Sequence, residues 1–138
     1  MEYIILNDIK SEELMYIRKL VNWNKPITLE QYKKALDNTM CKVLIKNDKD
    51  IIGLGRLVGD YSCKGLLSDI IVNPKYQGKG FGKIIVTNLI NQVKESLKEG
   101  EVFQIEASPT YGNRDFYVKC GMKYKPENQD GVYIWITK

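Results

Sequence analysis

Residues 69–82 read DIIVNPKYQGKGFG, and this stretch decides the fold of the chain. A run rich in β-branched residues ends at Pro74, a loop with three glycines follows, and a long amphipathic pattern opens at Phe81. A strand, a glycine loop and a helix start in this order bring free backbone amides and the positive end of a helix dipole to one point. Glycine lets an anion approach those amides because it has no side chain. The stretch therefore predicts a site for a phosphorylated ligand.

The glycine spacing narrows the choice of ligand. A P-loop needs G-x-x-x-x-G-K-[ST] and a Rossmann fingerprint needs G-x-G-x-x-G, and neither pattern occurs here. The segment from Gln77 to Gly82 instead reads Q-x-x-G-x-G, which resembles the acyl-CoA-binding motif of the GNAT superfamily of N-acetyltransferases. ATP or NAD on the same loop is the alternative, and competition binding would separate the two.

A second motif lies at residues 115–122, DFYVKCGM, and resembles the F-Y-x-K-x-G-F signature of that family with Met122 in place of phenylalanine. The resemblance implies that Tyr117 is the general acid that protonates the departing thiolate, as a phenol can. The alternative is that Tyr117 only packs its short helix against the sheet. The family commonly has an asparagine that contacts the cofactor seven residues earlier, where this chain has Thr110. Asn113 is expected to cap the helix, and the alternative is that it replaces that asparagine through a shifted loop.

The resemblance also implies how acetyl-CoA is held as a co-substrate. Backbone groups of the fourth strand, at Ile70, Ile71 and Val72, would pair with the pantetheine arm and polarise the thioester carbonyl. The pyrophosphate would lie on the loop and the helix start, that is, on Gln77, Gly78, Lys79, Gly80, Phe81, Gly82 and Lys83. For the two lysines a solvated surface position is an equal alternative. Direct transfer to an amine requires no metal, and none is expected.

The attacking amine must lose a proton, so a general base or a water relay is expected. Asp69 and Glu106 are the candidates, because they are polar members of otherwise apolar strands. Strand alternation puts Asp69 on the same face as Leu67 and Ile71, and Glu106 on the same face as Gln104. A structural role is the stronger alternative for both carboxylates.

Trp23 lies in a break between two helical patterns, and the resemblance implies that this loop closes over the acceptor. The indole ring could stack on an aryl group or hold an ammonium by cation–π attraction. A hydrophobic plug that anchors the loop is the alternative.

The remaining patterns give the order of elements. Leu14, Ile17, Arg18 and Val21 recur at helical spacing, and the helix that opens at Phe81 has an apolar residue at every fourth position. The predicted order is strand, two helices, three strands, helix, strand, helix and two strands. It matches the α/β (α+β) GNAT-like fold: one domain over residues 1–138, with a central mixed, mostly antiparallel sheet, splayed parallel fourth and fifth strands, and helices on both faces.

Composition limits the class of protein. Lys plus Arg number 21 against 17 Asp plus Glu, a modest excess that suits a polyanionic cofactor but lacks the basic run of a nucleic-acid binder. No apolar stretch would span a bilayer, the N-terminus lacks a signal-peptide pattern, and the three cysteines are widely spaced. We therefore expect a cytoplasmic protein with no nucleic-acid or membrane partner. The resemblance allows a homodimer, since dimers are frequent in the family.

The chain has no histidine, so Ser-His and Cys-His nucleophile pairs and histidine metal ligands are excluded. Together these observations predict an acyl-CoA-dependent N-acetyltransferase that moves acetyl from acetyl-CoA to a primary amine of a small molecule, by direct attack in a ternary complex. A non-catalytic acyl-CoA sensor, or acetylation of a peptide or protein amine, is the alternative.

Overall fold

The computed structural model describes residues 1–109, 113–126 and 131–138, and the order of elements in them is the predicted one. The strands are β1 (Ile4–Leu6), β2 (Cys41–Lys46), β3 (Ile51–Gly59), β4 (Lys64–Val72), β5 (Val102–Ala107), β6 (Lys123–Tyr124) and β7 (Val132–Thr137). The helices are α1 (Ser11–Leu20), α2 (Leu29–Asp37), α3 (Phe81–Ser96) and α4 (Arg114–Lys119), with one 3₁₀ turn at Pro74–Tyr76.

The strands form one mixed sheet in the order β1-β2-β3-β4-β5-β7-β6. Neighbours are antiparallel except β4 and β5, which are parallel and pair over three positions, Lys64 with Gln104, Gly65 with Ile105 and Leu66 with Glu106. Beyond Leu66 the two strands diverge, so the sheet is split between them. The predicted fold, including the splayed fourth and fifth strands, is confirmed.

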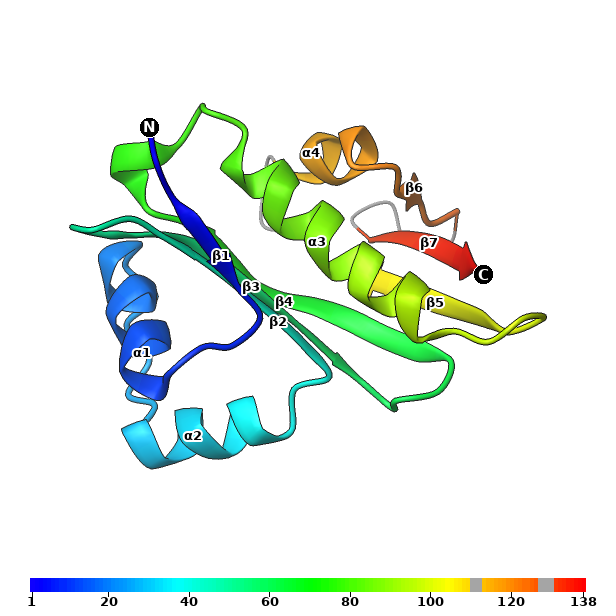
Figure 1. The fold of residues 1–138 in the computed structure, drawn as a ribbon, viewed down its shortest axis with the longest axis horizontal. Coiled ribbons are helices and arrows are strands. Elements are labelled where there is room, and N and C mark those ends of the chain that lie inside the picture. Colours follow the sequence, from blue (N-terminus) through cyan, green and yellow to red (C-terminus); the bar gives the residue numbers. More distant parts are fainter. Residues whose placement is uncertain (110–112, 127–130) are drawn as a thin grey trace.

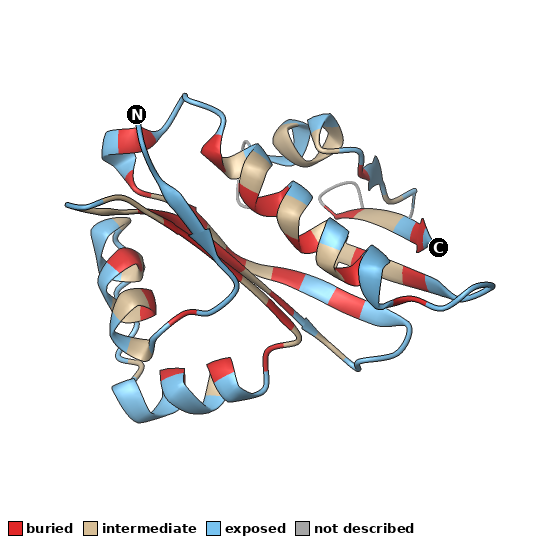
Figure 2. Ribbon diagram, in the orientation of Figure 1, coloured by how far each residue is buried: buried red, intermediate tan, exposed pale blue. Residues whose placement is uncertain are grey.

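Helices cover both faces of the sheet (Figure 1). The apolar stripe of α3, including Phe81, Ile85, Leu89 and Val93, is buried against one face of the sheet, and Figure 2 shows buried segments at intervals along this helix. A fully buried side chain of this size contributes about 1.5–3 kcal/mol relative to an exposed one. No helix in the described part of the chain has the length and apolar character needed to cross a membrane.

The opposite face carries a second core, built by α1 and α2 on β2, β3 and β4. Leu14 and Ile17 of α1 and Tyr32 and Leu36 of α2 are buried there. Thr28 caps α2 as a capping box, because its hydroxyl accepts from the Gln31 N–H while the Gln31 side chain accepts from the Thr28 N–H. These two helices therefore pack on the part of the sheet that lies on the β3 side of the split.

A β-bulge interrupts β4 at Asp69. Leu54 and Arg56, two residues apart on β3, pair with Ile71 and Ser68, three residues apart on β4. Asp69 takes a φ of 53°, in the left-handed region. Leu67 therefore packs in the core under α3, whereas Ile71 packs in the core under α1 and α2. The prediction that Leu67, Asp69 and Ile71 share a face is wrong, because the extra residue shifts the alternation.

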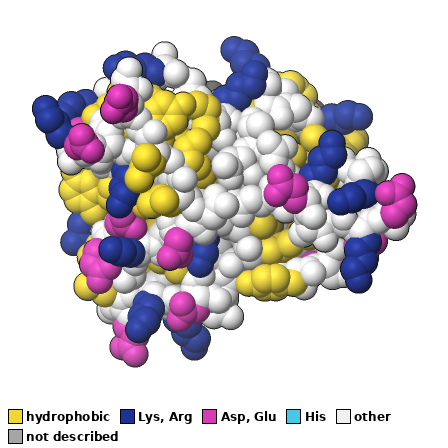
Figure 3. Space-filling view, in the orientation of Figure 1, with side chains coloured by type: hydrophobic (Ala, Val, Ile, Leu, Met, Phe, Trp, Pro, Cys, Tyr) yellow, Lys and Arg dark blue, Asp and Glu magenta, His cyan; other side chains and the backbone are white. Residues whose placement is uncertain are grey.

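The neighbouring strand β5 keeps strict alternation. Phe103, Ile105 and Ala107 are buried under α3, so Gln104 and Glu106 lie on the opposite face, as predicted. In the view of Figure 3, acidic and basic side chains are interspersed around the rim, and neither sign gathers into a continuous patch.

Candidate active site

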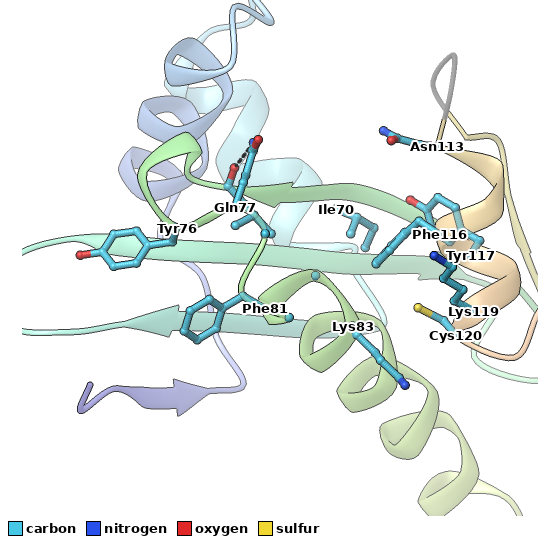
Figure 4. A pocket seen from close by; sticks show the side chains of 14 residues that line it. Ile70, Tyr76, Gln77, Phe81, Lys83, Asn113, Phe116, Tyr117, Lys119 and Cys120 are labelled. Atoms are coloured by element: carbon cyan, nitrogen blue, oxygen red, sulfur yellow. Dashed lines mark hydrogen bonds between the residues drawn. The ribbon is translucent and has the colours of Figure 1, made fainter.

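A cavity of about 560 Å³ opens where β4 leaves β5, and we call it the β4 cleft. Its walls come from β4, the glycine loop, the first turn of α3, and α4 (Figure 4). It brings together most residues predicted for the cofactor and the acid: Ile70, Val72, Gln77, Gly78, Gly80, Phe81, Gly82, Lys83 and Tyr117. Ile71 and Lys79 are not among its walls. The lining also includes Asn113, for which a cofactor contact was the alternative to capping, and four residues to which the sequence assigned no cofactor contact: Tyr76, Phe116, Lys119 and Cys120.

The edge of β4 provides backbone groups to the β4 cleft. The Asn73 N–H donates to the Ile52 carbonyl on β3, at 2.8 Å. Successive residues of a strand direct their backbone groups to opposite edges, so Ile71 faces β3 like Asn73, whereas Ile70 and Val72 face the split. Of the three residues predicted to pair with pantetheine, Ile70 and Val72 therefore hold the matching positions, and Ile71 is paired with Leu54.

The glycine loop leads from β4 into α3. Gly78 and Gly80 have φ of 78° and 90°, values that side chains disfavour, and open space surrounds the Cβ position of each. Gly80 is the N-cap of α3, so the N–H groups of the first helical turn lack intrahelical partners. This arrangement can bind a phosphate through backbone amides and the helix dipole.

Three polar side chains of this segment, those of Gln77, Lys83 and Lys79, lie in three different positions. The Gln77 amide donates to the Val72 carbonyl at 3.0 Å, which ties the loop back to the strand (Figure 4). Lys83 lines the β4 cleft, and its charge can add to that of the amides. Lys79 instead lies with its ammonium 5.8 Å from the centre of the Tyr76 ring, outside the lining.

Tyr117 comes from α4 and faces the cleft across from Ile70 (Figure 4). Its ring packs edge-on against Phe116, with 5.1 Å between centroids. Burial raises the pKa of the phenol to about 12, with a further contribution from Cys120. The hydroxyl is therefore protonated at neutral pH and can donate a proton to an anion in the cleft. Burial likewise raises the pKa of the Cys120 thiol.

Asn113 occupies the N-cap position of α4, but its side chain makes no capping hydrogen bond and instead lines the cleft. The prediction that this side chain caps the helix is wrong. Thr110, the residue at the position of the family's asparagine, lies outside the described residues.

Asp69 is held by two arginines that sequence reasoning did not connect to it. Arg56 of β3 donates from Nε to Oδ2 at 2.7 Å, and Arg18 of α1 pairs with Oδ1. The carboxylate is 4% exposed, so it is a buried ion pair rather than a group open to substrate. Arg18 stood on the apolar stripe of α1, and a cation at such a position is the signal that could have revealed a buried acidic partner.

Glu106 is also paired twice, with Lys125 at 2.9 Å and Lys64 at 3.4 Å. The hydrogen bond from Lys125 is the main cause that lowers the pKa of its carboxyl group. A carboxylate with a lowered pKa is a weaker base, which disfavours the general-base role.

Trp23 packs partly buried against the core under α1 and α2. The Arg18 guanidinium lies 5.2 Å from the centre of the Trp23 ring and 5.8 Å from the centre of the Tyr32 ring. Trp23 also lines a pocket of about 490 Å³ with Arg18, Asn22, Asn24 and Lys25, which we call the Arg18 pocket. The ring thus anchors the loop and borders an open space.

Comparison with known proteins shows the family to which the chain is similar. The model of the acetyltransferase (GNAT) family matches residues 6–122. The chain is 29% identical over 93 residues to GCN5-related N-acetyltransferase 2, chloroplastic, of Arabidopsis thaliana, which covers 67% of this chain and only 34% of that protein. It is 27% identical over 130 residues to the uncharacterized N-acetyltransferase ycf52 of Pyropia yezoensis, covering 91% of this chain and 72% of the relative.

Solved structures have the same fold. A probable acetyltransferase of unknown function from meticillin-resistant Staphylococcus aureus has a TM-score of 0.77 and 26% identity, over 92% of this chain and 95% of that one. PaiA N-acetyltransferase from Thermoplasma acidophilum, solved in complex with coenzyme A, has a TM-score of 0.69 and 17% identity over the full length of both chains. The family match covers most of the sequence, and the chain therefore belongs to the acetyltransferase (GNAT) family.

Proposed function

We propose that the protein is an N-acetyltransferase that moves acetyl from acetyl-CoA to a primary amine of a small molecule, by direct attack in a ternary complex. The observation that carries the proposal is the split between β4 and β5. It leaves one strand edge open to a cavity that has the glycine loop and the start of α3 at one end and a protonated phenol in its wall.

Acetyl-CoA fits the chemistry of this cavity. The free amides at the start of α3 and the Lys83 ammonium would hold the pyrophosphate. The backbone groups of Ile70 and Val72 would pair with the amide-containing pantetheine arm, as an added strand pairs with a sheet edge. The same edge then brings a backbone N–H close to the thioester carbonyl, where it would stabilise the oxyanion.

The reaction needs one bond formed and one broken. The neutral amine attacks the thioester carbon, the C–N bond forms, and the C–S bond of the tetrahedral intermediate breaks. The thiolate leaves and takes a proton, for which the Tyr117 hydroxyl is the donor in the cleft wall. Because Asp69 and Glu106 are each held by two cations, we propose that water, rather than either carboxylate, carries away the amine proton.

We further propose that the protein works in a reducing compartment such as the cytoplasm, on a diffusible amine. Cys41, Cys63 and Cys120 are all free thiols, which such a compartment would preserve.

Ligand-dependent thermal unfolding tests the proposal, with acetyl-CoA, CoA, ATP and NAD at equal concentration. A ligand at about 100 times its Kd adds roughly 2.7 kcal/mol of stability. We expect selective stabilisation by the two CoA species, followed by thiol release from acetyl-CoA with at least one member of an amine panel. Stabilisation by ATP or NAD alone would overturn the proposal. Tight CoA binding without thiol release for any amine would identify a sensor instead.

A further inference from the structure

On the face of the sheet that carries α1, the charged side chains near the split carry a net positive charge. On the β4 side of the split lies Asp69, and on the β5 side lies Glu106. Asp69 pairs with Arg18 of α1, and Glu106 alternates with residues buried under α3, so both side chains lie on the face opposite α3. Under the proposed function, the acceptor would approach the thioester from this face, because α3 and α4 lie on the other side of the sheet (Figure 1). The charges near these two carboxylates therefore set the field that an acceptor meets.

Each carboxylate is outnumbered by cations. Asp69 is paired with Arg18 and Arg56, so this group of three carries one net positive charge. Within the described residues, Nε of Arg18 is buried and has no hydrogen-bond partner, so Asp69 does not use all the donors that surround it.

The β5 side repeats the pattern with lysines. Glu106 is paired with Lys64 and Lys125, which again leaves one net positive charge. Unlike the arginines, the Lys64 side chain is 59% exposed, so its ammonium can turn toward a ligand.

The Arg18 pocket extends the positive charge toward the helix break. Among the residues that the structure describes, its lining contains Arg18, Lys25 and the amides of Asn22 and Asn24, and no carboxylate. Lys25 forms no ion pair in the part of the chain that the structure describes. Arg18 lines this pocket and also pairs with Asp69 of β4, and Ile70, the residue after Asp69, lines the β4 cleft.

We propose that the acceptor is an amine that also carries an anionic group, a carboxylate or a phosphate, and that this group binds at the Arg18 pocket through Lys25 while the amine reaches the thioester. The inference rests on the N-acetyltransferase function proposed above and names the substrate class for the same site.

A positive field serves the chemistry in two ways. It attracts the anionic group of the acceptor, and it disfavours the ammonium form of the attacking amine, which lowers that amine's pKa and raises the fraction able to attack. The second effect replaces a general base, which neither paired carboxylate provides. The same field repels polyamines, whose other ammonium groups gain no partner.

Matched acceptor pairs test the proposal through thiol release. One arm compares an amino acid with its carboxamide, a second compares glucosamine 6-phosphate with glucosamine, and a third uses spermidine. We expect kcat/KM at least about tenfold higher for the anionic member of one pair, a preference that shrinks as KCl is raised because salt screens it. The arm that shows the preference identifies the group as a carboxylate or a phosphate.

Lys25→Gln tests the residue named. It should raise KM for the anionic acceptor about three- to fivefold, the size of one partly exposed charge contact, and leave kcat and the neutral acceptor unchanged. Lys33→Gln, an exposed lysine on α2, is the matched control and should change neither. Equal or better turnover of neutral or cationic amines would overturn this inference while leaving the acetyltransferase function intact. CoA binding without thiol release from any amine would instead overturn the proposed function.

Discussion

The parallel strands β4 and β5 start as paired neighbours and then diverge. They differ in the regularity of their alternation and in the burial of their acidic residue. β5 alternates regularly, and its Glu106 is 21% exposed between two lysines. β4 has a bulge, and its Asp69 is 4% exposed between two arginines. Both strands contribute buried residues to the core, but the irregular one also presents an unpaired edge to the β4 cleft. The open edge thus coincides with a break in the period of the strand, and a buried ion pair lies at that break.

The largest effect that this comparison predicts is a loss of stability when the buried acidic residue is replaced. Asp69→Asn should lower the free energy of unfolding by about 3 kcal/mol, because it leaves Arg18 and Arg56 charged and largely buried without a counterion. Glu106→Gln should cost less than about 1 kcal/mol, because its lysines can turn to water. Urea denaturation at neutral pH measures both. Similar losses for the two variants would remove the distinction between the strands.

The next largest effect concerns chemistry at the split. Tyr117→Phe should lower kcat about a hundredfold and leave the Kd of acetyl-CoA unchanged, because the proposed role of the hydroxyl is to protonate the leaving thiolate and the ring still fills its place. Tyr16→Phe, at an exposed position of α1, serves as control and should match the unmodified protein. A Tyr117→Phe variant with normal turnover would eliminate this residue as the acid.

Substitutions of two glycines, one near the bulge of β4 and one before β5, test the same difference between the strands with a smaller expected effect. Gly55 of β3 lies opposite the bulge, and a Cβ there would come within 2.5 Å of Ile85 and 2.8 Å of Ile70. Gly55→Ala should cost about 2 kcal/mol by overpacking, and should also weaken acetyl-CoA binding, because Ile70 lines the cleft.

Gly100 precedes β5, with a φ of 85° and open space around its Cβ position. Gly100→Ala should cost about 1 kcal/mol through its backbone alone. Thermal unfolding and acetyl-CoA titration of the two variants test the contrast. Weaker binding in Gly100→Ala would show that the effect is not specific to the bulge.

The smallest effect depends on pH. The folded state lowers the pKa of Glu106, so the stability that this carboxylate contributes is present above its unfolded pKa of about 4.3 and is lost as pH falls through the folded value. The stability difference between the unmodified protein and Glu106→Gln should therefore be present at neutral pH and disappear in strong acid. Urea midpoints of both proteins across this range provide the measurement. A difference that persists in acid would mean that the side chain acts by packing.

The sequence predicts the order of elements and the glycine loop well, because both depend on local features. Phe81 and Ile85 repeat at a helical period, and Gly78 and Gly80 take backbone angles that other residues disfavour. The bulge at Asp69 could not be predicted in this way, since it is defined by the register with β3. The partners of Asp69 are Arg18, which is 51 residues away in the sequence, and Arg56. Such contacts depend on the assembled sheet.

The three cysteines provide a built-in reporter of ligand occupancy. Cys41 is buried, with its pKa raised to about 11, Cys63 is exposed, and Cys120 lines the β4 cleft. An alkylating reagent would therefore label Cys63 at once and Cys41 only after unfolding, which gives a reference at each extreme. Labelling of Cys120 would fall between the two and slow down whenever the cleft is filled. Mass spectrometry of one labelled sample could thus read cleft occupancy and global unfolding together, without an engineered probe.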